Sequence, residues 1–182
     1  LITHSLDFLK KMLAFGITTV EGKSGYGMDY DTELKQLRVM KRLGELQPVS
    51  IVRTFLGAHA VPPSYKDRND EFIDFLIRDV MPTVAKEKLA EFCDVFCEKG
   101  VFSIEESRKL LTAAREQGFK LKIHADEIVT FGGSELAGEL KCTSADHLLH
   151  ASEAGIKALA DNGVVATLLP KTAFCLKEPY AA

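Results

Sequence analysis

The residues with the clearest chemical potential form the tetrapeptide His124-Ala125-Asp126-Glu127. The residues before it, 120–123, predict a strand that ends at His124, and a strand end holds an imidazole as rigidly as metal ligation requires. Glu127 follows in the loop, where its carboxylate could take a proton from an activated water and pass it to a leaving nitrogen. A structural histidine hydrogen-bonded in the same place is the alternative that the tetrapeptide leaves open.

Three further side chains could bind a substrate or stabilise charge on it. His147 follows Asp146, and its imidazole could stabilise the attacked centre or shuttle a proton, or it could be a core histidine paired with Asp146. His59 has small neighbours, which leave room for a ligand beside the ring, although plain packing explains it equally well. Tyr26 lies between two glycines, which suits either a side chain presented into a pocket or an ordinary turn tyrosine.

Six short apolar runs, rich in β-branched residues, predict the strands that position these side chains. Their ranges are 17–21, 51–59, 94–97, 121–124, 144–148 and 164–169. Runs that are apolar at successive positions are typical of parallel strands covered on both faces. Amphipathic helical segments separate them, with expected starts at Asp31, Asn69, Ser103, Ser134 and Ser152, and a loop is expected at 177–182. Strict alternation of strand and helix predicts an α/β fold with a parallel sheet and right-handed crossovers.

The predicted sheet could close in two ways, as an open doubly wound sheet or as a barrel. A doubly wound sheet usually carries a glycine-rich phosphate loop that leads directly into a helix. The glycine-rich segment 22–27 is followed by Met28-Asp29-Tyr30, and it matches neither the dinucleotide fingerprint nor the P-loop. A barrel that lacks some of its strands, with about six βα units, therefore fits better.

Polar residues recur at the ends of successive predicted strands. They are Glu21, Lys23 and Tyr26 after the first, His59 at the second, Glu98 and Lys99 after the third, His124, Asp126 and Glu127 at the fourth, and Asp146 and His147 at the fifth. Barrel active sites are built at this carboxyl-terminal face, so three histidines are expected to converge on one mouth. Lys23 could clamp an anion, but a solvated loop lysine is the favoured interpretation. His4 and His150 are interpreted as surface residues.

This combination favours metal-assisted hydrolysis over phosphate or hydride chemistry. A catalytic metal typically needs three protein ligands, and His124 is the one visible ligand, so the remaining ligands are expected from outside the chain. Both ends of the sequence also look cut, with helical spacing close to residue 1 and a loop at residue 182, so the chain is expected to be a piece of a longer protein.

Composition narrows the class of protein. The 182 residues are 46% hydrophobic and 27% charged, with a formal net charge of −3, which is ordinary for a soluble globular domain. There is no basic stripe to bind nucleic acid and no apolar run of roughly 18 residues to span a membrane. The four cysteines, Cys93, Cys97, Cys142 and Cys175, lack paired C-x-x-C spacing and are interpreted as reduced thiols in the cytosol.

Several linked motifs resemble the imidazolonepropionase family of metal-dependent amidohydrolases. They lie in order at 21–27, 54–62, 92–98, 122–127 and 145–148, so the similarity covers essentially the whole chain. The resemblance implies a distorted (β/α)₈ TIM barrel of the amidohydrolase type, incomplete here. Residues 1–182 would be the central part of one barrel domain, with the flanking strands and a small β domain missing. It also implies hydrolysis of 4-imidazolone-5-propanoate to N-formimidoyl-L-glutamate in histidine degradation.

By the same resemblance, each candidate residue acquires a role. His124 would bind one zinc or iron ion, Glu127 would contact the substrate and act as base, His147 would assist at the tetrahedral intermediate, and Tyr26 and His59 would bind the substrate. A His-x-His ligand pair and an arginine for the substrate's propionate would lie before residue 1, and an aspartate ligand would lie after residue 182. A cytoplasmic homodimer is implied, with no nucleic-acid or membrane partner. Another cyclic amide or amidine hydrolase, a deaminase, or a non-catalytic barrel piece are the alternatives.

Overall fold

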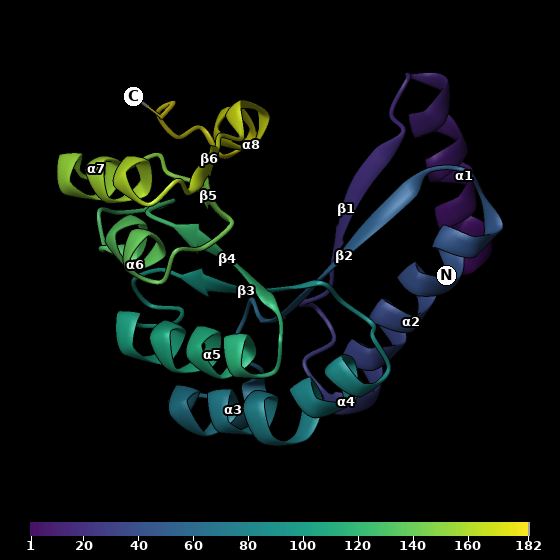
Figure 1. Cartoon of the computed structure of the whole chain (residues 1–182), viewed down its shortest axis with the longest axis horizontal. Helices are drawn as coiled ribbons and strands as arrows, with labels where there is room; N and C mark the ends of the chain where they lie inside the picture. The colour runs from purple at the N-terminus through teal and green to yellow at the C-terminus, as the bar shows by residue number, and fades with distance from the viewer. Residues whose placement is uncertain (182) are drawn as a thin grey trace.

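The computed structural model describes residues 1–181, which contain one six-stranded sheet (Figure 1). Its strands are β1 (Thr19–Lys23), β2 (Ser50–Ala58), β3 (Phe92–Cys97), β4 (Lys120–Ala125), β5 (Ser144–His147) and β6 (Val165–Thr167). They lie side by side in chain order, and every neighbouring pair is parallel. All six predicted strands are confirmed. Ala182, the last residue of the predicted C-terminal loop, lies outside the described residues.

Helices connect the strands in the alternation that the sequence predicts. They are α1 (Ile2–Ala14), α2 (Tyr30–Leu46), the 3₁₀ turn η1 (Pro63–Tyr65), α3 (Asn69–Phe75), the π-helical turn η2 (Leu76–Val80), α4 (Met81–Lys86), α5 (Ile104–Glu116), α6 (Gly133–Glu139), α7 (Glu153–Asp161) and α8 (Pro170–Leu176). None of the helices within residues 1–181 is long and apolar enough to cross a membrane.

The predicted helix caps are partly correct. Ser103 forms a capping box with Glu106, and Ser152 accepts a hydrogen bond from the third residue of α7. The predicted cap at Asp31 is wrong, because Asp29 accepts the hydrogen bond from the Thr32 N–H. Asn69 is likewise no cap, since its side chain donates to the Val101 carbonyl instead. Helix α8 was not predicted; it follows β6 directly and begins at a proline, a residue preorganised for a helix start.

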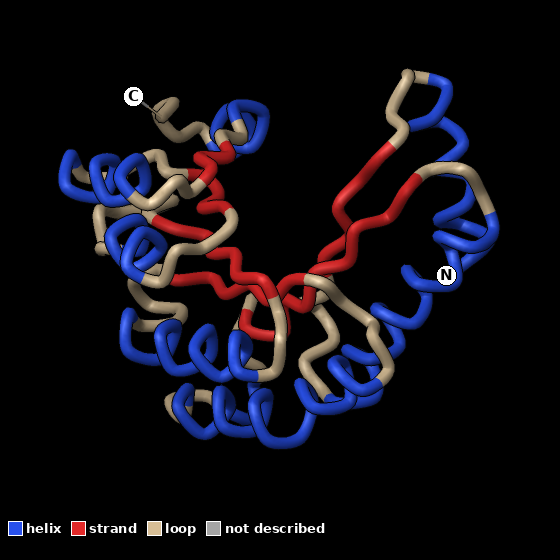
Figure 2. The backbone as a smooth tube through the Cα atoms, viewed as in Figure 1, coloured by secondary structure: helices blue, strands red, loops and turns tan. Residues whose placement is uncertain are grey.

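The sheet curls into an arc, and helices α2 to α7 lie along its outer, convex side (Figure 2). This confirms the predicted incomplete barrel of about six βα units. Side chains alternate between the two faces of each strand. In β3, Cys93 and Val95 are fully buried in the core that the sheet shares with the helices. Asp94, between them in the chain, therefore projects to the inner, concave face.

Close contact between α6 and α7 depends on a glycine. A Cβ atom added to Gly138 would lie 2.6 Å from the Ala158 carbonyl oxygen, which is backbone and cannot move alone. We expect Gly138→Ala to lower the free energy of unfolding by roughly 1–3 kcal/mol through overpacking, as measured by urea denaturation. Gly44 in α2 has nothing within 4 Å of an added Cβ, so Gly44→Ala should instead raise stability by about 0.5–1 kcal/mol. Equal effects of the two substitutions would contradict this packing account.

Candidate active site

Aromatic and imidazole rings from five successive strand ends meet at the carboxyl-terminal edge of the sheet. The ring centroids of His124 and His147 are 5.2 Å apart, and those of His59 and His124 are 6.0 Å apart. The ring centroid of Tyr26, from the loop after β1, lies 4.7 Å from that of His59. Phe96 of β3 stacks on His59, with 5.6 Å between the ring centroids. The structure thus brings the three predicted histidines together, while their chemical roles stay predictions.

Within this ring cluster, His147 contacts Glu127. The His147 Nδ1 lies 3.2 Å from a Glu127 carboxylate oxygen, and both residues are 8% exposed. Burial and the nearby His124 lower the pKa of His147 to about 4, so its imidazole is neutral at pH 7. Burial also raises the pKa of Glu127, against the opposing effect of His124. A carboxylate with a raised pKa is suited to accept a proton and release it again.

A partly buried lysine, Lys23, contacts two carboxylates close to His124. The Lys23 ammonium lies 2.7 Å from the Asp94 carboxylate and 2.7 Å from the Asp146 carboxylate. Burial acts to lower the pKa of Lys23, but the two aspartates outweigh it and hold this pKa above its usual range. Burial would conversely raise the pKa of Asp94, yet His124 and Lys23 hold it well below its usual range. Lys23 and Asp94 are therefore both charged at neutral pH.

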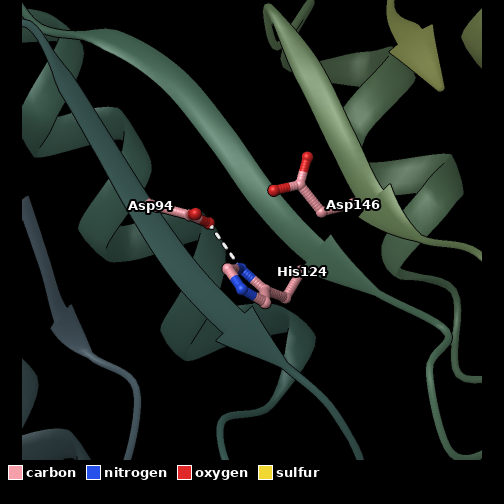
Figure 3. Close-up of side chains that lie close together, drawn as sticks. All are labelled: Asp94, His124 and Asp146. Carbon is pink, nitrogen blue, oxygen red and sulfur yellow. Dashed lines mark hydrogen bonds and ion pairs between the residues drawn. The ribbon is translucent and has the colours of Figure 1, made fainter. Parts of the chain in front are cut away.

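Asp94 also fixes the orientation of the His124 ring (Figure 3). Its Oδ1 lies 3.1 Å from His124 Nδ1, and the Asp94 side chain is completely buried. Burial lowers the pKa of His124, but the Asp94 carboxylate outweighs it and raises this pKa. Because Nδ1 is engaged by Asp94, Nε2 is the nitrogen of His124 left for a metal ion. A metal-ligating histidine commonly has a carboxylate on its other ring nitrogen in this manner.

Asp94, His124 and Asp146 offer three ligand atoms within 4.8 Å of one another, a donor set that suits a divalent metal ion (Figure 3). Two of the three donors, however, already share a cation. The ammonium of Lys23 contacts both aspartates at 2.7 Å and shares its single positive charge between them. His124 Nε2 on the other side of the ring is free of this constraint. A metal ion between the two aspartates would therefore have to replace the Lys23 ammonium.

Two residues of the polar strand ends differ from expectation. The interpretation of Lys23 as a solvated loop lysine is wrong, because Lys23 lies in β1 with its side chain only 22% exposed. The alternative that paired His147 with Asp146 is also wrong, because Asp146 binds Lys23 and His147 contacts Glu127.

The interpretation of His150 as a surface residue is wrong in part, since its Nε2 is buried. Glu98 is buried and accepts the N–H groups of Lys99 and Ile128, a loop-holding role.

Asp94 was missed as a site residue. The signal that could have found it is a lone carboxylate in the apolar run 92–97, because a charge buried in such a strand needs a partner. The same argument applied to Lys122 would have found its 2.8 Å contact with Glu21. A cavity of about 820 Å³ lies elsewhere, near the start of α3 and α5, and five acidic side chains but none of the histidines line it.

Comparisons with known proteins place the chain among related sequences and folds. No family model matches it. It is 68% identical to an imidazolonepropionase of Clostridium tetani over 173 residues, 95% of this chain and 41% of that protein. It is 68% identical to an imidazolonepropionase of Bacteroides thetaiotaomicron over 176 residues, 96% of this chain and 42% of that protein. The chain therefore spans about two fifths of the length of these curated relatives.

Solved structures agree on the fold. An adenine deaminase from Arthrobacter aurescens superposes with a TM-score of 0.66 at 18% identity, covering 97% of this chain and 54% of that one. A guanine deaminase from C. acetobutylicum, with guanine bound in its active site, gives a TM-score of 0.57 at 13% identity, covering 96% of this chain and 46% of that one. At this level of identity, the likeness shows a shared barrel architecture.

Proposed function

We propose, from the premise that this chain is homologous to imidazolonepropionases over 95% of its length, that the complete protein containing it hydrolyses 4-imidazolone-5-propanoate. The product would be N-formimidoyl-L-glutamate, formed during histidine degradation. The observation that carries the proposal is the meeting of His59, His124 and His147 with Glu127 at one edge of the sheet. The 68% identity to named imidazolonepropionases supports this substrate over those of other hydrolases with the same fold.

The chain would be the central part of one amidohydrolase barrel domain. The relatives are more than twice its length, which leaves room for flanking strands and a small β domain. Those segments would carry a His-x-His ligand pair, an aspartate ligand and an arginine for the propionate group. A cytoplasmic homodimer is proposed on the same resemblance.

His124 would hold the metal, zinc or iron, through Nε2, because Asp94 occupies Nδ1. When bound, the metal would polarise the ring carbonyl and make water nucleophilic at neutral pH. Tyr26 and His59 would bind the substrate. Glu127 would accept the proton of the attacking water as it adds to the ring carbonyl carbon, then deliver that proton to the nitrogen that leaves as the carbon–nitrogen bond breaks. Neutral His147, 3.2 Å from Glu127, would stabilise the tetrahedral intermediate.

His59 gives a separate prediction, on substrate binding. Its ring contacts those of Tyr26 and Phe96, and its Nδ1 is buried without a partner among the described residues, so we assign the other ring nitrogen, Nε2, to the substrate. We expect His59→Phe to keep the stacking but raise KM about tenfold or more, because one hydrogen bond to the substrate is lost. Steady-state kinetics check this. An unchanged KM would remove His59 from substrate binding.

The proposal is tested by the ultraviolet-monitored loss of imidazolonepropionate with the complete, metal-loaded protein. We expect turnover with this substrate to exceed turnover with guanine or dihydropyrimidines. A faster reaction on either of those would move the protein to another cyclic amide or amidine hydrolase or a deaminase. The absence of turnover on all of them would favour a non-catalytic barrel.

A further inference from the structure

Asp126, the third residue of the central tetrapeptide, has its carboxylate in an unusual setting. The residue is completely buried, and its carboxylate accepts five hydrogen bonds. Oδ1 accepts the N–H groups of Phe131, Gly132 and Gly133 at 2.8, 3.0 and 3.3 Å. Oδ2 accepts the N–H group and the hydroxyl of Ser134 at 2.9 and 2.5 Å. One side chain therefore closes the whole loop between β4 and α6, the loop that carries Glu127.

The backbone of Asp126 ties this loop to the next one. Its carbonyl oxygen accepts the His150 N–H at 2.8 Å, and the Thr130 hydroxyl donates to the His150 carbonyl at 2.7 Å. One residue earlier, the Ala125 carbonyl accepts the Leu148 N–H at 3.1 Å. The loops after β4 and β5 are thus joined on either side of the Glu127–His147 contact.

The backbone is strained where these loops begin. Asp126, His147 and Leu148 have φ values of +50°, +78° and +59°, in the left-handed region that residues with a Cβ seldom adopt. Such conformations persist when surrounding contacts over-determine them, and they cluster at functional sites. The five hydrogen bonds to the Asp126 carboxylate are the densest set of such contacts here.

We propose that Asp126 is a positioning residue that holds Glu127 within reach of His147, a role that rests on the proposed function of those two residues. Asp126 itself faces the loop backbone and would touch neither substrate nor metal. Glu98 supports the same loop from β3 by accepting the Ile128 N–H at 2.8 Å. Asp126 differs from Glu98 in organising both the loop of Glu127 and, through its carbonyl, the loop of His147.

The test compares Asp126→Asn with wild type in the complete protein. An amide side chain keeps the size of the carboxylate but sets its own N–H groups against the backbone donors. We expect kcat to fall about 10- to 100-fold with little change in KM, because a base displaced by about 1 Å loses rate rather than binding. We also expect amide hydrogen exchange at 127–134 and 147–150 to accelerate at least tenfold. Asp126→Glu should fail to restore kcat, since the longer side chain cannot fit the same donors.

Gln47→Ala is the matched control, because the Gln47 side chain holds the loop before β2 by three hydrogen bonds to backbone groups, at the opposite, amino-terminal edge of the sheet. It should lower stability while leaving kcat per folded molecule unchanged. If the wild-type protein is active and Asp126→Asn has the same kcat, the positioning role of Asp126 is wrong while the proposed function stands. Should wild type prove inactive on imidazolonepropionate, the proposed function fails, and the exchange measurement still decides: unchanged exchange at 127–134 and 147–150 would overturn the role of Asp126.

Discussion

Replacing Glu127 with glutamine is expected to lower turnover by about 10²-fold or more while leaving the metal content unchanged. The amide has nearly the size of the carboxylate and can remain beside His147, whose Nδ1 lies 3.2 Å from Glu127 in the wild-type protein. It cannot take a proton from water or deliver one to a leaving nitrogen. Burial raises the pKa of the Glu127 carboxyl, which brings it nearer to the pH at which proton transfer is most effective. Steady-state kinetics and metal analysis of the purified variant measure the two quantities.

Glu139→Gln is the control for this change of chemistry. Glu139 lies on α6, where it pairs with Arg108 on an exposed surface, so the variant should keep wild-type kcat. If Glu127→Gln also turns over at the wild-type rate, Glu127 is not the base.

Replacing Lys23 with methionine is expected to lower the free energy of unfolding by roughly 3–5 kcal/mol. The ammonium of Lys23 lies between the carboxylates of Asp94 and Asp146. Its loss leaves these two carboxylates facing one another without a cation between them, and Asp94 is completely buried. Lys122, 3.9 Å from Asp146, compensates only in part. Urea denaturation at neutral pH measures the change. Lys157→Met is the control, because that surface pair with Asp161 should contribute within about 0.5 kcal/mol.

The direction of the pH dependence follows from Asp94. Its pKa in the folded protein is below the unfolded value of about 4, because His124 and Lys23 outweigh the effect of burial. Its contribution is therefore fully present above about pH 4 and is lost as the pH falls through the folded-state pKa. A Lys23→Met variant that loses less than about 1 kcal/mol at pH 7 would contradict the buried ion-pair account.

Much of this architecture is readable in the sequence because the signals are local. The apolar runs around Val95, Ile123 and Ala145 specify strands, and parallel alternation forces the residues that follow them to one edge of the sheet. That argument suffices to bring His59, His124 and His147 together. The Ser103 capping box is equally local, since donor and acceptor are three residues apart.

The charged cluster around Lys23 could not be read in the same way. Lys23 meets Asp94 and Asp146 across 71 and 123 residues of chain, and only the curvature of the sheet brings them into contact. A two-residue displacement of β1 put Lys23 inside the strand rather than in the loop, which changed its environment from solvent to barrel interior. The cap at Asp29 was missed for a related reason, since the sequence offers two aspartates, Asp29 and Asp31, and only the geometry of the turn selects between them.

The most direct test of the site is to locate the metal by anomalous diffraction from crystals of the complete protein grown with zinc or iron. An anomalous peak at Nε2 of His124, with the Lys23 ammonium still between Asp94 and Asp146, is the predicted result. A peak between Asp94 and Asp146 in place of that ammonium, or no peak beside His124, would contradict the account.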